Sequence, residues 1–465
     1  MKDVIVVHDP TIELETISIK DVEFGTDPKY KPNGNETKYS KLIGEYEPYV
    51  TINGLNFTGD DLIMFMIDTT GFIPKLNISV SGKGGMLQSR SYLKDGDSIN
   101  ILIRSTNPDY KPIRIDFENI KVTSSPVDSD TGSDVTYGIS GIMKIPKFIN
   151  KDLIKSFPNH SSFKVCRELS KEFGLGLQTN DNNTDDEMTW IIPNTNAFDF
   201  ISNDISEHCY KNDSSFFKLF IDFYYYLNFI EVNQIIDHKI KIDDNVVNLL
   251  TASEHQPTDE ERTRLKLPRI LSNSKAVNNT PFKIKAYTLV SDSGGISFKN
   301  AYQNHLLFYD KSNAAFEQFF LESLNTNDSD NKIIMKNKVD VDIREYKKLT
   351  HIGRRSTNTH KNYDIAKYQN RINLDELEKF TLVADLESVN LEVRMFESIP
   401  VYIFTGDSNY FRARSDDDKG VMLDKFISGN WLIKSIFHMY DKNTGNFNTR
   451  LLLTKREFEY PHRNT

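Results

Sequence analysis

Four short stretches carry residue types that could do chemistry, but their spacing fits none of the common sites. His208 and Cys209 are adjacent, whereas zinc ligands follow C-x-x-C or H-x-x-x-H spacing. The glycine-rich Ser81–Gly85 lacks the Gly-Lys-Ser/Thr ending and the helix of a phosphate loop. Asp416–Asp418 lacks the alternate ligands and terminal Glu of a calcium loop. The basic stretch His351–Lys361 lacks interleaved aromatics, so we interpret it as a solvated loop or an inter-subunit contact. We therefore predict no catalytic residue, no metal site and no cofactor.

Length and charge narrow the class of protein. A chain of 465 residues is too long for a single core, so two to four domains are expected. The net charge of −9 disfavours a protein whose main task is to grip nucleic acid, because such proteins carry a basic excess. No apolar run approaches the roughly 20 residues that span a bilayer, and the N-terminus does not have the pattern of a signal peptide. The two cysteines, Cys166 and Cys209, are expected to be buried free thiols.

Two amphipathic helices are predicted in the middle of the chain. Ser161 or Ser162 suits the N-cap of the first helix, and Gly174 suits the left-handed position after its last turn. Its apolar side holds Phe163, Cys166, Leu169 and Phe173. The second helix is expected to begin at Thr195 or Asn196, and its apolar stripe consists of Phe198, Ile201, Ile205 and Cys209.

An aromatic run follows, from Phe216 to Ile230, with only Lys218 and Asp222 as charged residues. Its β-branched and aromatic content favours a buried strand, although periodicity alone leaves a helix open. Left in solvent, the run would form an apolar patch much larger than soluble monomers expose. We expect it to be mostly buried, either inside the subunit or between subunits. The residues singled out are Phe216, Phe220, Tyr224 and Leu227.

Period-two patterning on both sides of this segment predicts antiparallel β-structure. Ile99, Ile101 and Ile103 alternate with more polar residues, as do Ile113, Ile115 and Phe117. Near the C-terminus, one strand face is predicted to carry Trp431, Ile433, Ser435, Phe437 and Met439. After a turn, the returning strand carries Phe447, Thr449, Leu451 and Leu453. Gly429 precedes this hairpin at a position where a left-handed or closely packed backbone is expected, and His438 is expected to have a structural role.

The predicted fold class is α+β. The expected division is an N-terminal arm over 1–44, a β-domain over 45–148, an α/β domain over 149–245, a linker or excursion over 246–280, and a second β-domain over 281–465. A helix near 363–380 is expected within the last of these.

This order of elements resembles the baseplate central hub of contractile-tail bacteriophages, a family related to the N-terminal hub part of VgrG. The similarity is one of pattern and covers roughly residues 45 to 465. The stretches that carry it are DGDSINILI, KPIRIDFENIKV, FKVCRELSKEFGLGLQTN, MTWIIPNTNAFDFISNDI, FFKLFIDFYYYLNFI, FISGNWLIKSIFHMYD and RLLLTKREF.

The resemblance implies two tail-tube-like antiparallel β-barrels that flank the α/β domain. It implies a homotrimer whose six β-bodies form a pseudo-sixfold ring between a hexameric tail-tube or tube-initiator ring and a trimeric spike protein. The central channel is expected to be polar or acidic, so that DNA or tape-measure protein passes without specific binding. The implied location is the virion tail baseplate, after assembly in the host cytoplasm. In this family the hub is a structural protein and no enzyme.

One alternative from a different class stays open, a tail-associated hydrolase that cuts cell-wall peptide or glycan. Such an enzyme needs paired carboxylates in a cleft, a Cys/His pair or a metal site. Acidic residues are plentiful in the chain, but none of them forms a group with the spacing of such a catalytic site.

Overall fold

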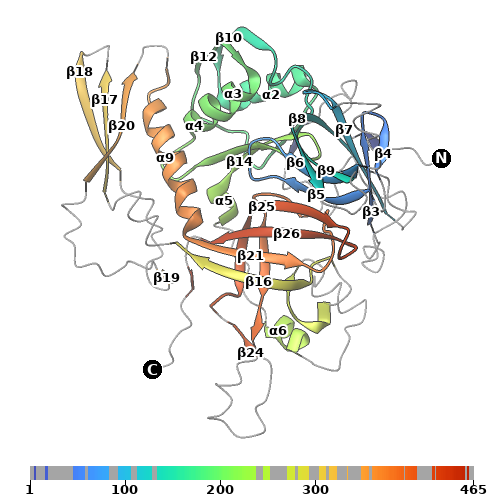
Figure 1. Ribbon diagram of the computed structural model, residues 1–465. Helices are drawn as coiled ribbons and strands as arrows, with labels where there is room; N and C mark the ends of the chain where they lie inside the picture. Colours follow the sequence, from blue (N-terminus) through green and yellow to red (C-terminus); the bar gives the residue numbers. More distant parts are fainter. Residues whose placement is uncertain are drawn as a thin grey trace, which may run out of the picture.

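The computed structural model of this chain is mostly antiparallel β-sheet with few helices (Figure 1). This agrees with the predicted predominance of antiparallel β-structure. The structure describes residues 5–6, 16–18, 46–57, 61–82, 93–105, 113–127, 134–236, 244–251, 270–277, 281–292, 303–310, 314–321, 332–333, 347–355, 359–391, 393–405, 422–424, 426–455 and 458–459. Most of the 1–44 arm, Asp416–Asp418 and the end of the glycine-rich stretch lie outside these residues.

One large sheet runs through both predicted β-domains, 45–148 and 281–465, which we call the two β-bodies. Its strands are hydrogen-bonded in the order β16-β21-β26-β25-β5-β6-β9-β8-β7-β3-β4, and each neighbouring pair is antiparallel. The N-terminal strands are β3 Tyr46–Ile52, β4 Leu55–Phe57, β5 Leu62–Asp68, β6 Lys75–Gly82, β7 Ser98–Ser105, β8 Ile113–Val127 and β9 Asp134–Met143. The C-terminal strands are β16 Ile284–Ser291, β21 Phe380–Leu386, β25 Gly429–Asp441 and β26 Asn446–Lys455.

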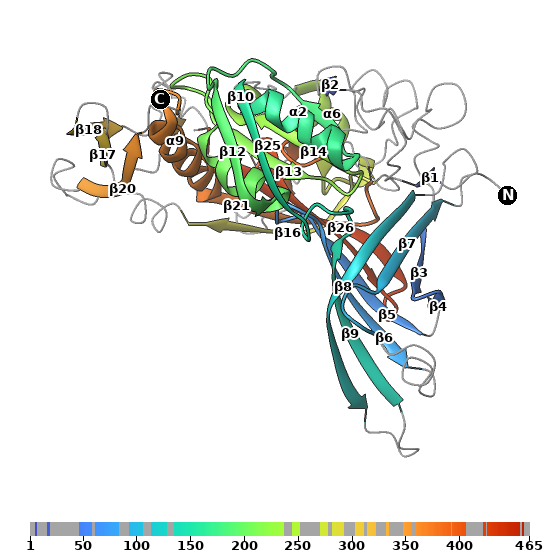
Figure 2. The same ribbon diagram turned by 90° about the horizontal axis from the view of Figure 1, so that it is seen from above.

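The expected alternation decides which side chains of the N-terminal strands enter the core. Ile99, Ile101 and Ile103 of β7 are fully buried, as are Ile115 and Phe117 of β8. The distal half of the β8–β9 hairpin extends away from the rest of the molecule (Figure 2).

Strand β25 joins the two halves of the large sheet. Its first residues pair with β22 (Ser398–Tyr402), and its last residues, Phe437–Asp441, pair with β5. A register shift between Ile433 and Ser435 marks a bulge. The predicted single face of this strand is therefore wrong, because the bulge moves the buried set from Trp431 and Ile433 to Ile436 and His438. The prediction for the returning strand β26 is confirmed, since Phe447, Thr449, Leu451 and Leu453 are all buried.

The α/β region holds a sheet in the order β13-β14-β11-β2 and a separate two-stranded ribbon of β10 and β12. The bounds are β2 Thr16–Ser18, β10 Asp152–His160, β11 Gly176–Thr179, β12 Met188–Asn196, β13 Phe217–Ile221 and β14 Tyr226–Glu231. Strand β11 is parallel to β14 and to β2, whereas β13 and β14 are antiparallel.

Both predicted helices of this region begin where the sequence placed them. Helix α2 (Ser162–Phe173) has Ser161 as its N-cap and Gly174 in the left-handed conformation after its last turn. Asn196 caps the second helical segment, which continues through α3 (Ala197–Asp199), a π-helical turn (Phe200–Ile205) and α4 (Ser206–His208). Cys166 and Cys209 are buried free thiols, as expected.

The predicted C-terminal helix is α9 (Tyr363–Glu376), followed by a 3-10 turn over Leu377–Lys379. Figure 1 shows α9 between the α/β region and a small sheet in the order β18-β17-β20. The strands of that sheet are β17 Gln303–Asp310, β18 Ala315–Leu321 and β20 Lys347–Arg355.

The segment predicted as a linker or excursion contains regular structure where it is described. Helix α6 (Asp244–Thr251), Ile270 and a 3-10 turn (Lys275–Val277) contribute to a small core with Tyr402 and Phe404. Strand β15 (Leu271–Ser272) pairs with β22, and Leu271 enters the core that contains Trp431. Short pairings complete the topology, and they involve β1 Ile5–Val6, β19 Lys332–Ile333, β23 Phe404–Thr405, β24 Met422–Leu423 and β27 Phe458–Glu459. No helix in the described part of the chain is long and apolar enough to cross a bilayer.

Candidate interaction site at the aromatic hairpin

The aromatic run folds as a hairpin, β13 and β14, which corrects the expectation of one continuous strand. We call residues 216–231 the aromatic hairpin. Its turn, Asp222–Tyr225, contains neither Gly nor Pro, and Asp222 is its only residue of a type common in turns. The Asp222 carboxylate makes the turn by accepting hydrogen bonds from the backbone N–H groups of Tyr224 at 2.9 Å and Tyr226 at 3.0 Å. Tyr225 takes a positive φ of 64°.

Burial of the aromatic hairpin inside the chain is confirmed, and its apolar side chains enter two different cores. Phe216, Phe220, Ile230 and Val232 belong to the core that contains Trp431 and the C-terminal strands. Leu227 and Tyr224 belong to the core of the N-terminal strands and α2, together with Phe217, Leu219, Ile221, Phe223, Tyr225, Tyr226 and Phe229. Because successive residues of a strand point to opposite faces, one hairpin serves both cores.

The other residues singled out from the sequence lie on β25. Trp431 is buried in the same core as Phe216 and Phe220, and its indole N–H donates to the Ile427 carbonyl at 2.7 Å. His438 is fully buried, and its ring meets the ring of Phe223 edge to face at 5.1 Å. The structure thus brings His438 to the hairpin tip and Trp431 to the hairpin's other face. Their roles as structural or interface residues stay predictions.

The His438 imidazole sits in a neutral polar pair. Its Nδ1 lies 3.0 Å from the Thr449 hydroxyl, which in turn accepts the backbone N–H of Asn390 at 2.8 Å. Burial lowers the pKa of His438 from 6.5 to about 3, because the charged ring would lose its hydration. The imidazole is therefore neutral in the folded protein at ordinary pH.

Replacing Gly429 is expected to destabilise the C-terminal half. Gly429 has a φ of 124°, which side chains rarely adopt, and a Cβ there would come within 3.0 Å of Lys455 Nζ, which lies over the Trp431 ring. We expect Gly429→Val to lower the free energy of unfolding by about 1–3 kcal/mol, measured by denaturant titration. Gly71→Ala is the matched control, since a Cβ at Gly71 meets only ordinary contacts. Equal stability of both variants would contradict the strain argument.

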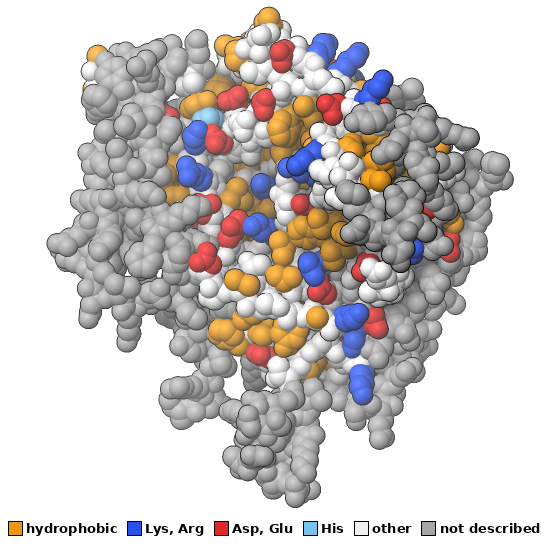
Figure 3. Space-filling model, in the orientation of Figure 1, with side chains coloured by type: hydrophobic (Ala, Val, Ile, Leu, Met, Phe, Trp, Pro, Cys, Tyr) orange, Lys and Arg blue, Asp and Glu red, His pale blue; other side chains and the backbone are white. Residues whose placement is uncertain are grey.

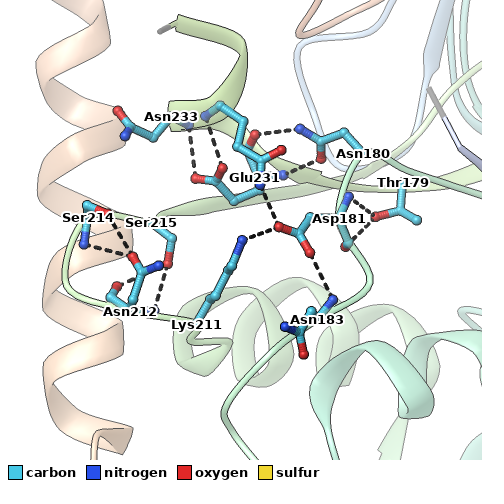
Figure 4. Close-up of polar contacts among 11 residues, drawn as sticks. Thr179, Asn180, Asp181, Asn183, Lys211, Asn212, Ser214, Ser215, Glu231 and Asn233 are labelled. Atoms are coloured by element: carbon cyan, nitrogen blue, oxygen red, sulfur yellow. Dashed lines mark hydrogen bonds and ion pairs between the residues drawn. The ribbon is translucent and has the colours of Figure 1, made fainter. Parts of the chain in front are cut away.

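A polar cluster that the sequence reading missed lies where β11 and β14 end (Figure 4). The Asn180 side chain exchanges two hydrogen bonds of 2.8 Å with the backbone of Glu231, and so extends the β11–β14 pairing by a side chain. The Glu231 carboxylate accepts the backbone N–H groups of Asn233 at 3.1 Å and Gln234 at 2.9 Å, which caps helix α5 (Val232–Ile236). Burial raises the pKa of Glu231 despite these bonds.

Asp181 is the second carboxylate of this cluster. It accepts hydrogen bonds from the Lys211 ammonium, from Gln234 Nε2 at 2.5 Å and from the Asn183 backbone N–H at 2.9 Å. Burial alone would raise the pKa of Asp181, but the Lys211 contact and these bonds hold it below its usual value. Since internal donors bind both carboxylates, the cluster holds together the loop after β11, the loop that carries Lys211 and helix α5. Among the described residues no group of His, Cys, Asp and Glu is placed to hold a metal ion.

A second contact missed by the sequence reading attaches α9 to the aromatic hairpin. Asn370 accepts the backbone N–H of Phe217 at 2.9 Å and donates to the Cys209 carbonyl at 2.9 Å. Gln369 donates to the carbonyls of Asn212 at 2.9 Å and Ser215 at 2.5 Å. Both amides are buried, so these bonds satisfy loop carbonyls that would otherwise be costly to bury. The sequence signal for this contact was the pair of adjacent amide residues, Gln369 and Asn370, within the predicted helix.

No protein-family model matches the sequence, and no curated protein matches it. Solved structures with a similar arrangement include the 43 kDa tail protein of prophage MuSo2 from Shewanella oneidensis, at 11% identity and TM-score 0.49 over 89% of this chain and 99% of that chain. A tail protein of Neisseria meningitidis is similar at 10% identity and TM-score 0.45 over 88% of this chain and 96% of that one.

An Escherichia coli component of the type VI secretion system, described as structurally similar to bacteriophage T4 tail proteins, is similar at 8% identity and TM-score 0.41 over 89% of this chain and 77% of that chain. These are tail and secretion-system proteins, the class that the sequence resemblance named.

Proposed function

We propose that this chain is a structural subunit of a phage tail hub, which assembles head to tail into a homotrimeric ring around a channel. The observation that carries the proposal is the single antiparallel sheet that runs through both β-bodies and contains two long stretches of strand paired on one side only. Among the described residues β16 pairs only with β21 along its length, and residues 119–127 of β8 pair only with β9.

Unpaired edges of this length favour pairing with another chain. Successive strands from β16 to β8 alternate in direction, so β16 and β8 run oppositely. In a ring every copy has the same orientation, and the β8 edge of one copy therefore meets the β16 edge of the next in an antiparallel sense. Such head-to-tail contacts form a ring when the rotation between neighbouring copies closes after three copies, and they pair both of these edges.

Two β-bodies in each copy would give the trimer a pseudo-sixfold sheet. That symmetry suits a hexameric tail-tube ring on one side and a trimeric spike on the other. The predicted partners, including tape-measure protein and DNA that passes through the channel, follow from this arrangement. The virion tail is the corresponding location.

The open face of the large sheet is the candidate channel wall. Figure 3 shows apolar side chains on this face, mixed with acidic and basic ones. Met64 and Val290 are exposed on it, and Arg450 pairs with Asp385 at 2.5 Å. We therefore propose a wall of mixed character in place of the uniformly polar or acidic wall expected from the resemblance.

Disulfide trapping tests the proposed ring. Thr123→Cys on the β8 edge and Thr288→Cys on the β16 edge, combined in one chain, should yield oxidised dimers and trimers, because both positions lie on the edges that are proposed to pair between copies. The native thiols are buried and should stay unreacted. The matched control pairs Thr123→Cys with Ser388→Cys, an exposed residue after β21.

Native mass measurement and imaging of the purified chain complete the test. A trimeric ring with the edge cross-link supports the proposal. Monomers that join neither a tube protein nor a spike protein would reject it. Hydrolysis of purified cell wall would favour the enzymatic alternative.

A further inference from the structure

The tip of the aromatic hairpin contacts both β-bodies at the place where they join. Tyr225 Oη donates to the Asp116 carbonyl of β8 at 3.1 Å and accepts the Asp116 N–H at 3.2 Å. Tyr224 Oη donates to the Leu391 carbonyl, in the C-terminal half, at 2.7 Å. Phe223 packs against His438 on the joining strand β25. Three consecutive side chains thus reach three elements of the large sheet and its connections.

From these contacts we infer that Phe223, Tyr224 and Tyr225 form a strut that sets the angle between the two β-bodies. The inference rests on the proposed function, since the angle matters for closing a ring of identical copies. In the proposed ring, the strut is the part of each subunit that sets the curvature.

The direct connection between the two β-bodies is one strand pairing, extended at its ends by hydrogen bonds of Lys442 to Ile63 and of Thr69 to Ile436. Among the described strands only β5 and β25 pair across the junction, over Met64–Asp68 and Phe437–Asp441. Neighbouring strands in a sheet can be twisted relative to one another over a range of angles, so a single ladder leaves the angle between the two β-bodies variable. The side-chain contacts with Asp116 in one β-body and with Leu391 in the other restrict the angle between the two bodies.

The strut itself is held rigidly. Asp222 fixes the turn through its bonds to Tyr224 and Tyr226, and Ile221 donates its backbone N–H to the Phe72 carbonyl at 2.7 Å. All three strut side chains are buried. The positive φ of Tyr225 is unfavourable for a bulky residue, and it persists because the surrounding contacts impose it.

Arg394 adds a further tie at the same place. Its Nη1 donates to Gln178 Oε1 of β11 at 2.9 Å, and its guanidinium lies 6.0 Å from the centre of the Tyr224 ring. The α/β region is therefore attached to the loop that holds Leu391, on the C-terminal side of the joint.

The test measures the angle between the bodies and the ring separately. Spin labels at Asn77→Cys on β6 and Ser388→Cys after β21, both exposed, report the distance between the two bodies. Labelled chain is diluted into unlabelled chain, so that each measured distance lies within one copy. Tyr225→Phe removes the two hydrogen bonds that its hydroxyl makes with Asp116, and Tyr224→Phe removes the one that its hydroxyl makes with Leu391. The matched control is Tyr137→Phe, since the buried Tyr137 hydroxyl has no hydrogen-bond partner in the structure.

We expect a single narrow distance in the parent chain and in Tyr137→Phe, and a broader distribution in the two strut variants. Ring yield should fall about fivefold to tenfold for each strut variant, because each loses the hydrogen bonding of one buried hydroxyl. Unchanged distances and unchanged ring yield in both strut variants would overturn the inference. If the parent chain forms no ring, the hub proposal fails, while the distance distributions still decide whether the strut sets the angle. If Tyr225→Phe does not fold, Tyr224→Phe provides the same comparison.

Discussion

Acidification is expected to remove about 4–5 kcal/mol of folding stability through His438 alone, at about 1.4 kcal/mol per pKa unit. The folded-state pKa is about 3, whereas the unperturbed value is 6.5. Below pH 6.5 the unfolded chain binds a proton at this ring and the folded chain does not. The contribution is therefore complete above pH 6.5, and it is lost progressively as the pH falls towards 3.

The measurement is the free energy of unfolding by denaturant titration at several pH values between 3 and 7, for the parent chain and His438→Gln. The glutamine keeps a neutral hydrogen-bonding group, so this variant should lose the His438 part of the slope. Other groups titrate as well; burial raises the pKa of Asp186, which opposes the loss at low pH. The difference between the two chains isolates His438, and identical slopes would contradict its neutral burial.

Replacing Phe220 with alanine is expected to lower the free energy of unfolding by about 3–5 kcal/mol, the range for a buried Phe→Ala change. Phe220 is only 1% exposed, and its ring lies 5.5 Å from that of Phe396. Truncation leaves a cavity between the aromatic hairpin and the C-terminal strands, and rigid neighbours on two sides limit collapse into it.

Thermal and denaturant melts of Phe220→Ala test this expectation. Ile154→Ala is the matched control, because Ile154 is 85% exposed on β10 and its truncation removes little buried surface. That control should stay within about 0.5 kcal/mol of the parent chain. If Phe220→Ala has the same melting temperature and denaturant midpoint as the parent chain, the hairpin contributes little to the C-terminal core.

Local signals in the sequence were sufficient for elements whose determinants are neighbours in the chain. Ser161 and Gly174 mark the ends of α2, and Asn196 caps the following helical segment, because capping depends on a few adjacent residues. The alternation in β7 identified its buried isoleucines for the same reason. The hydrophobic content of the aromatic run was enough to expect its burial.

Features that depend on contacts between distant residues were missed or misassigned. The turn at Asp222 has no Gly or Pro, and the hydrogen bonds of one carboxylate define it. The bulge after Ile433 arises where β25 changes partner from β22 to β5, and no residue type in the strand predicts it. Asn180 and Asn370 gain their roles from backbone groups, and Asp181 gains its role from the Lys211 side chain, and all of these partners lie tens of residues or more away in the chain.

The helices of the α/β region with their caps, the mainly antiparallel β-structure and the burial of the aromatic run could be predicted, because each depends on residue type and short-range periodicity. Three features depend instead on long-range packing: the two β-regions share one sheet, one hairpin fills two cores, and Tyr224 and Tyr225 contact both halves of the chain. Strand order and side-chain contacts at long sequence separation are set by packing of the whole chain, and no local pattern encodes them.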